Sequence, residues 1–129
     1  MILVDSSVWI DLLRKRPTRE TEALKRFSVD EAIAVADVCL FEVLQGEHPE
    51  ARFVRAYEML REFVIIAVGG ELIAVAAARN AQLLRSKGVQ ATAIDCLLAT
   101  YCLVNGLRLL TSDNDFEPFV THLGLDLVR

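Results

Sequence analysis

Short, almost wholly apolar segments alternate with longer helical patterns along the whole chain, and this alternation constrains the fold more than any other feature. Apolar runs of this length, bounded by polar turns or by glycine, are typical of buried strands. The predicted strands cover residues 1–4, 32–36, 63–68, 107–110 and 125–128. Strands without a polar face are typical of parallel sheets that helices cover on both sides. The sequence therefore predicts an α/β fold with a short, mainly parallel central sheet sandwiched by helices.

The helical spacing of apolar residues predicts the elements between these strands. They cover residues 8–13, 19–27, 37–45, 49–62, 71–87, 92–105 and 118–123. Ser6 or Ser7 is a suitable N-cap for the first of these helices and Asp37 for the third, and Gly88 ends the longest. A chain of 129 residues has room for one hydrophobic core. We therefore expect a single domain over residues 1–129.

Composition excludes several classes of protein. With 53% hydrophobic and 25% charged residues, the chain is not intrinsically disordered. No apolar run approaches the roughly 20 residues of a membrane-spanning helix, and Asp5 interrupts the apolar start too early for a secretory signal. We therefore expect a cytoplasmic protein with no membrane partner. Because Cys39, Cys96 and Cys102 form no C-x-x-C pair, we expect reduced, buried thiols.

Positive charge is concentrated in one segment, although the net charge of the chain is −4. Residues 14–26 carry six basic side chains against two acidic ones, whereas the rest of the chain carries eight basic and sixteen acidic ones. A basic segment beside an acidic body is suited to hold a polyanion near an acidic pocket. A solvated helix face is the alternative interpretation.

Four carboxylates stand out by their positions. Asp5 directly follows the first predicted strand and Asp113 follows the fourth, so both belong at the carboxyl edge of a parallel sheet. Glu42 and Asp95 are lone charges in otherwise apolar helices, without Lys or Arg one turn away. Such a carboxylate is rarely buried unless it is paired or binds a metal. Each acid alone also has a structural explanation. The two acids that follow strands could be helix caps or turn residues, and the two acids in helices could lie at a solvent-exposed helix edge.

Together the four acids predict a cation site. Like charges in one cleft repel each other, so they stay ionised together only when a cation joins them. All the donors are oxygens, and His48 and His122 form no ligand pattern, which favours Mg²⁺ or Mn²⁺ over zinc. Such an ion binds a phosphate and lowers the pKa of a water molecule for in-line attack. This is the chemistry of phosphodiester hydrolysis.

Four motifs in this order resemble those of the PIN-domain ribonucleases, and most closely those of the VapC toxins of toxin–antitoxin pairs. The motifs are Val4–Ile10, the apolar helix with Glu42 and Gly46, Asp95–Ala99 and Leu110–Phe116. The resemblance covers essentially the whole chain. It implies a PIN-like fold and a metal-dependent endoribonuclease that uses Mg²⁺ or Mn²⁺ and a metal-activated water. It also implies a homodimer and a small VapB-type antitoxin that plugs the cleft.

The resemblance implies roles for individual residues. The matches to the family's four catalytic and metal-binding acids are Asp5, Glu42, Asp95 and Asp113. The residues that fall at supporting positions are Ser7, Thr111 and Asp115. From the basic segment 14–26, the predicted RNA contacts are Arg14, Lys15 and Arg16.

The residues leave two alternatives open and disfavour a third. A catalytically idle protein–protein interaction module could keep an acidic cleft without a cation, and a metal titration distinguishes it. A metal-dependent DNA nuclease would have the same acids, and only the family resemblance favours RNA. A receiver or phosphatase domain needs a second Asp close to the first, where this chain has Ser6 and Ser7. The apolar helix 71–87 fits either a core position or burial by a second copy or an antitoxin.

Overall fold

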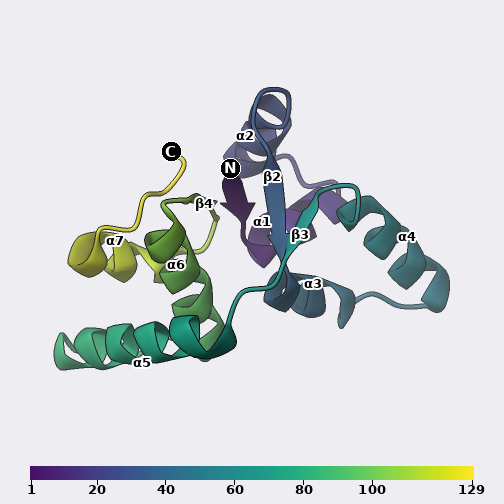
Figure 1. Cartoon of the computed structure of the whole chain (residues 1–129). Coiled ribbons are helices and arrows are strands. Elements are labelled where there is room, and N and C mark those ends of the chain that lie inside the picture. The colour runs from purple at the N-terminus through teal and green to yellow at the C-terminus, as the bar shows by residue number, and fades with distance from the viewer.

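A four-stranded parallel sheet forms the centre of the computed structural model, which describes all 129 residues (Figure 1). The strands are β1 (Ile2–Val4), β2 (Ile33–Ala36), β3 (Val64–Ile66) and β4 (Arg108–Leu110). They lie in the order β3-β2-β1-β4, and Leu3 of β1 is in register with Ala34 of β2 and Leu109 of β4. Both β1 and β2 are wholly buried. The predicted α/β class with a parallel sheet is confirmed.

Seven α-helices and one 3₁₀ helix complete the fold. They are α1 (Ser6–Leu13), α2 (Arg19–Phe27), α3 (Asp37–Leu44), α4 (Glu50–Leu60), α5 (Gly70–Ser86), α6 (Ala93–Asn105), the 3₁₀ helix η1 (Asn114–Phe116) and α7 (Glu117–Leu123). In Figure 1, α5, α6 and α7 gather on one side of the sheet and α1 to α4 on the other. All seven predicted helices are present, and their ends differ from the prediction by at most two residues.

The sheet separates two hydrophobic clusters, because successive strand residues point to opposite faces. Leu3 joins the cluster that contains Leu98 of α6 and Phe119 of α7. Ile2 joins the second cluster, in which Trp9 of α1 is fully buried. The Trp9 indole donates a hydrogen bond to the Val4 carbonyl at 3.1 Å, so this aromatic side chain is part of the core.

Helix capping differs from the sequence-based expectation at two places. Asp5, rather than Ser6 or Ser7, is the N-cap of α1, and its side chain accepts a hydrogen bond from the Ser7 N–H. Asp37 is the first residue of α3 rather than its cap. Its carboxylate accepts from the Val68 N–H at 3.2 Å and so connects α3 to the chain after β3. Both aspartates serve a further contact besides the helix end.

The predicted strand over residues 125–128 is wrong. This segment forms a single parallel bridge between Leu127 and Leu109 of β4. Two backbone hydrogen bonds hold it there, from Leu109 to Asp126 and from Val128 to Leu109. Only Leu127 pairs with β4, and the left-handed Gly124 that ends α7 directly precedes this segment.

The longest helix, α5, is apolar on several faces but buries only one. Ala77 and Leu84 lie in the core, whereas Leu72 is 83% exposed and Val75 is also exposed. The domain therefore buries one face of α5 in its core and leaves apolar side chains of the other faces exposed. None of the helices has the length and apolar composition needed to cross a bilayer.

Candidate active site

The four predicted acids lie on separate segments of the chain that meet at the same edge of the sheet. Asp5 follows β1 directly and caps α1. Glu42 lies in α3, which begins where β2 ends. Asp95 is in the first turn of α6, and Asp113 follows β4 by three residues and caps η1. Parallel strands bring such segments together at their carboxyl ends.

Distances between possible ligand atoms divide the acids into two neighbouring groups. The carboxylates of Asp5 and Glu42 lie within 4.8 Å of each other, and those of Asp95, Asp113 and Asp115 lie within the same distance of one another. The negative charges of Asp5 and Glu42 also raise the pKa of Asp95, so the two groups are close enough to repel each other. All four predicted acids and Asp115 therefore form one acid cluster.

Burial and mutual repulsion make ionisation of this cluster unfavourable. Burial, with the added repulsion of Asp5, Asp113 and Glu42, raises the pKa of Asp95 to about 6. Burial also raises the pKa of Glu42, and the charge of Asp5 adds to this shift. Raised pKa values from closely spaced carboxylates indicate a place where a cation would be stabilised.

Asp5 is held by one carboxylate oxygen, while the other has no hydrogen-bond partner. Oδ2 accepts from the Ser7 hydroxyl at 2.7 Å, from the Thr111 hydroxyl at 2.9 Å and from the Ser7 N–H at 3.4 Å. Oδ1 accepts no hydrogen bond, although Asp5 is only 4% exposed. No fully buried side-chain oxygen of the chain lacks a partner, so Oδ1 is reached by solvent. A carboxylate oxygen that no donor occupies is open to a cation. A cation at Oδ1 would satisfy it, so the residues present fit a divalent metal ion.

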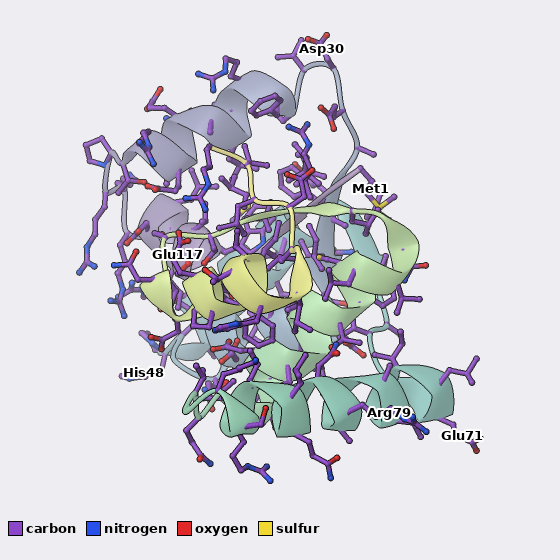
Figure 2. The ribbon with its side chains drawn as sticks, turned by 90° about the vertical axis from the view of Figure 1, so that its left-hand side faces the viewer. Met1, Asp30, His48, Glu71, Arg79 and Glu117 are labelled. Atoms are coloured by element: carbon purple, nitrogen blue, oxygen red, sulfur yellow. The ribbon has the colours of Figure 1, made fainter.

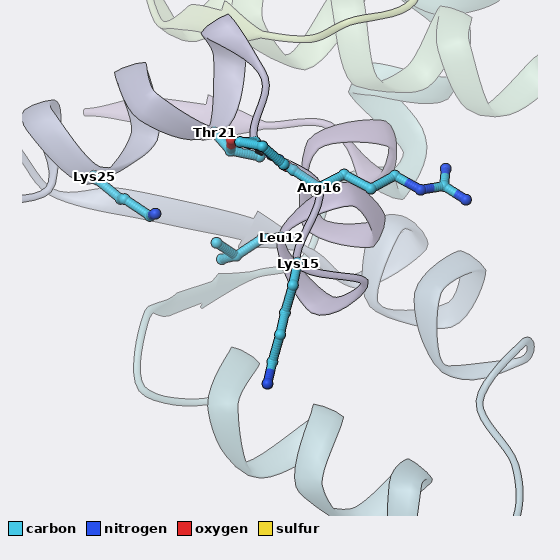
Figure 3. A pocket seen from close by; sticks show the side chains of 6 residues that line it. Leu12, Lys15, Arg16, Thr21 and Lys25 are labelled. Atoms are coloured by element: carbon cyan, nitrogen blue, oxygen red, sulfur yellow. Dashed lines mark hydrogen bonds between the residues drawn. The ribbon is translucent and has the colours of Figure 1, made fainter.

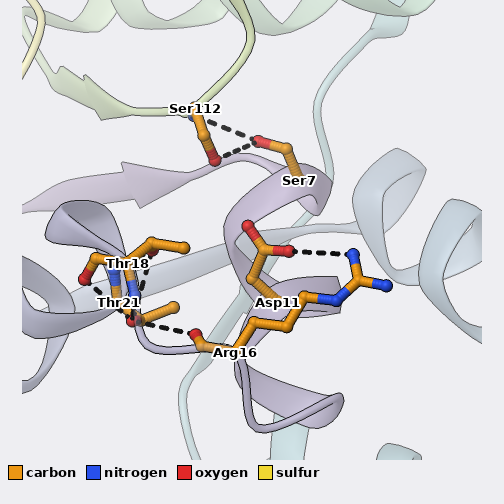
Figure 4. A network of polar contacts seen from close by, with 6 residues as sticks. All are labelled: Ser7, Asp11, Arg16, Thr18, Thr21 and Ser112. Carbon is orange, nitrogen blue, oxygen red and sulfur yellow. Dashed lines mark hydrogen bonds and ion pairs between the residues drawn. The ribbon is translucent and has the colours of Figure 1, made fainter.

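Ser7 and Thr111 also fasten the loop that carries Asp113. The Ser112 N–H donates to the Ser7 hydroxyl at 3.2 Å (Figure 4), and the Asp113 N–H donates to the Thr111 hydroxyl at 3.0 Å. Asp113 in turn accepts from the Asp115 N–H at 2.9 Å. The two hydroxyl residues predicted at supporting positions thus connect Asp5 with the Asp113 loop.

Two residues of the acid cluster escaped the sequence analysis. Ser6 donates its hydroxyl to Glu42 at 3.0 Å, although the sequence suggested only a cap. The sulfur of Cys39 lies within 4.8 Å of the Asp5 and Glu42 carboxylates. All three cysteines are free and buried, as predicted, and burial raises the pKa of the Cys39 thiol well above its usual range. The spacing of three residues between Cys39 and Glu42 was the available signal, because it places both on one helix face.

Histidines and the more distant acids stay outside the cluster. His48, Asp30 and Glu71 lie at the margin of the molecule (Figure 2). Neither His48 nor His122 belongs to a group of possible metal ligands. The donor set of the cluster is therefore made of carboxylate oxygens and one thiol.

The basic side chains near the end of α1 diverge. Arg16 turns back to Asp11 at 3.6 Å (Figure 4), and Asp11 lines an open hollow of about 590 Å³ together with Asp113 and Asp115. The Lys15 side chain points away from that of Arg16, although both residues line a second hollow, of about 270 Å³ (Figure 3). Arg14, the C-cap of α1, is exposed. Of the three predicted RNA contacts, Arg16 therefore borders the acidic hollow through its ion pair.

Comparisons with known proteins agree with this geometry. The family model described as PIN domain matches residues 2–119. Among curated proteins, ribonuclease VapC11 of Mycobacterium tuberculosis is 26% identical over 120 residues, which cover 91% of this chain and 90% of that protein.

Solved structures share the fold over nearly the whole chain. VapBC2 from Rickettsia felis, bound to a DNA fragment from its promoter, has a TM-score of 0.80 at 17% identity and covers 99% of this chain and 98% of its own. A toxin–antitoxin complex from Klebsiella pneumoniae has a TM-score of 0.76 at 22% identity, with coverages of 100% and 97%. VapC20 of Mycobacterium tuberculosis, a toxin that cleaves the sarcin–ricin loop, has a TM-score of 0.67 at 17% identity, with coverages of 91% and 93%.

Proposed function

The chain belongs to the PIN-domain family, and from that premise we propose that it is a metal-dependent endoribonuclease, the toxin of a type II toxin–antitoxin pair. The observation that carries the proposal is the convergence of Asp5, Glu42, Asp95 and Asp113 from four segments of the chain. The similarity to ribonuclease VapC11 supports RNA as the substrate.

In this proposal the four acids hold one or two Mg²⁺ or Mn²⁺ ions, with Asp115 in support. Carboxylate oxygens are the preferred ligands of both ions. A bound ion would polarise the RNA phosphate and lower the pKa of a water molecule. It would also relieve the repulsion that raises the pKa of Asp95 to about 6.

The surrounding hydroxyls orient the acids. Ser7 and Thr111 hold Oδ2 of Asp5, which leaves Oδ1 for the cation. Ser6 holds Glu42 through its Oε1. Because these hydrogen bonds fix the carboxylates in place, the carboxylates need little reorganisation on binding.

The purified protein, freed of any antitoxin, is expected to cleave RNA in Mg²⁺ or Mn²⁺ and to stop when EDTA is added. Gel analysis of total RNA measures this, and DNA of matched length tests the nuclease alternative. Cleavage of DNA alone would contradict the ribonuclease assignment. Neither cleavage nor metal binding by calorimetry would favour the idle interaction module.

We propose two protein partners, a small VapB-type antitoxin and a second copy of the chain. Solved structures with this fold include toxin–antitoxin complexes, which supports the first. Large apolar side chains on α3, α5 and α6 provide surface for partners. The most exposed of these are Phe41, Leu72 and Val104. Since Phe41 is next to Glu42, a partner that covers it would also reach the acid cluster.

We further propose that Arg14, Lys15 and Arg16 contact RNA phosphates. Replacing all three with Gln is expected to flatten the dependence of log affinity on log salt by about 0.7 for each phosphate that is no longer neutralised. Fluorescence anisotropy of single-stranded RNA in EDTA measures binding without cleavage. The matched control replaces the exposed Arg79 and Arg85 of α5 and its C-cap Lys87, on the other side of the sheet. If log affinity depended equally on log salt in the Gln variant and in the native protein, the basic segment would be a solvent-exposed helix face without an RNA contact.

A further inference from the structure

The proposed nuclease reaction leaves one ligand-type side chain of the acid cluster without a role. The Cys39 sulfur and the carboxylates of Asp5 and Glu42 all lie within 4.8 Å of one another. Cys39 is completely buried in the hydrophobic cluster that contains Leu3, and its sulfur faces the Ser6 backbone N–H. Asp5 is also buried, and its Oδ1 accepts no hydrogen bond. Two buried ligand groups therefore lie together with a third that the solvent reaches.

The backbone holds these three groups close together. Cys39 and Glu42 lie one turn apart on the same face of α3. Asp5 caps the adjacent helix α1, and the Ser6 hydroxyl connects the two helices through Glu42 at 3.0 Å. The three groups therefore come from rigid elements.

We propose that Asp5, Cys39 and Glu42 form a site for a thiophilic divalent ion such as Zn²⁺ or Cd²⁺, which inhibits the chain by competing with Mg²⁺ or Mn²⁺. The inhibition rests on the proposed function, whereas the binding does not. Mg²⁺ and Mn²⁺ favour oxygen ligands, but thiolates bind softer ions, and three protein ligands with one open position suit tetrahedral Zn²⁺. When the sulfur–metal bond forms, the S–H bond breaks and its proton passes to solvent.

Titration with Cd²⁺ tests the site, because a sulfur-to-cadmium charge-transfer band in the ultraviolet reports the thiolate ligand directly. The native protein is expected to show this band, saturating at one ion per chain. Cys39→Ala should abolish the band and weaken Cd²⁺ binding about tenfold or more. Cys102→Ala is the matched control, because that thiol is buried in α6 away from the acids, and it should keep the band.

Two results would overturn the site: no band in the native protein, or an undiminished band in the Cys39→Ala protein. Circular dichroism establishes that the variants fold. If Cys39→Ala does not fold, Cys39→Ser, which preserves side-chain size, takes its place in the test. A Mn²⁺ titration of the same variants checks that the carboxylates still bind a hard ion. A band without ribonuclease activity would contradict the proposed function alone, and Mn²⁺-dependent cleavage without a band would contradict the thiophilic site alone.

Discussion

The Asp5→Asn protein is expected to lose RNA cleavage by at least about 10²–10³-fold while it keeps its fold. Asparagine is as good an N-cap as aspartate, so α1 keeps its first turn. The amide oxygen can accept the hydrogen bonds that Ser7 and Thr111 now donate to Oδ2. The amide NH₂ then takes the position of Oδ1 and carries donors where a cation needs an acceptor. Rates on one defined RNA in Mn²⁺, with thermal melts of each protein, measure the two effects separately.

Asp30→Asn is the matched control for this substitution. Asp30 is an exposed acid at the margin of the molecule, in the loop before β2, and lies outside the acid cluster (Figure 2). The same change of charge there should leave the rate within about twofold of the native protein. If the Asp5→Asn protein kept native activity, Asp5 would not be part of the catalytic site.

Mg²⁺ or Mn²⁺ is expected to raise the melting temperature, and to raise it more at pH 7.5 than at pH 5. A ligand that binds only the folded state, at about 100 times its Kd, adds about 2.7 kcal/mol. For a domain of this size that is roughly 10 °C. Differential scanning fluorimetry with and without EDTA measures the shift. A melting temperature that the ions leave unchanged at pH 7.5 would contradict metal binding.

The pH dependence follows from Asp95, whose pKa rises from 3.8 to about 6 on folding. Because the folded state binds this proton more tightly, the contribution is fully stabilising below about pH 4 and is lost as the pH rises through 6. Asp95 is only partly buried, so solvent screening reduces the effect to about 1 kcal/mol. Asp95 should therefore lower the stability of the metal-free protein over this window, and Asp95→Asn should remove that contribution and reduce the effect of the ions. A dependence of stability on pH between 4 and 6.5 that is the same in the native and the Asp95→Asn protein would contradict this account of Asp95.

The alternation of elements predicted the fold well because apolar strands and helix ends are encoded locally. The same local signals identified Asp5 and Asp113 after strands, and Glu42 and Asp95 as lone charges in apolar helices. Their convergence followed from parallel topology rather than from any one motif. Whether each acid binds a metal stays a prediction.

The sequence did not predict features that depend on how the side chains of one helix or loop point toward those of another. The proximity of Cys39 to Asp5 depends on how α3 packs beside α1, which sequence spacing does not specify. The divergence of Lys15 and Arg16 depends on the tight turn after α1, where Lys15 has a positive φ of 56°. The composition of the basic segment does not specify that turn, so it could not show which cation borders the acidic hollow.

The hydrogen bond between Thr111 and Asp5 joins positions 106 residues apart. During synthesis, the ribosome releases Asp5, Glu42 and Asp95 well before β4 and the Asp113 loop. Until β4 pairs with β1, the fourth acid is missing and Oδ2 of Asp5 lacks the Thr111 hydroxyl. A nascent chain therefore lacks the complete acid cluster until the Asp113 loop has been made, which would delay the proposed ribonuclease activity until β4 has paired with β1.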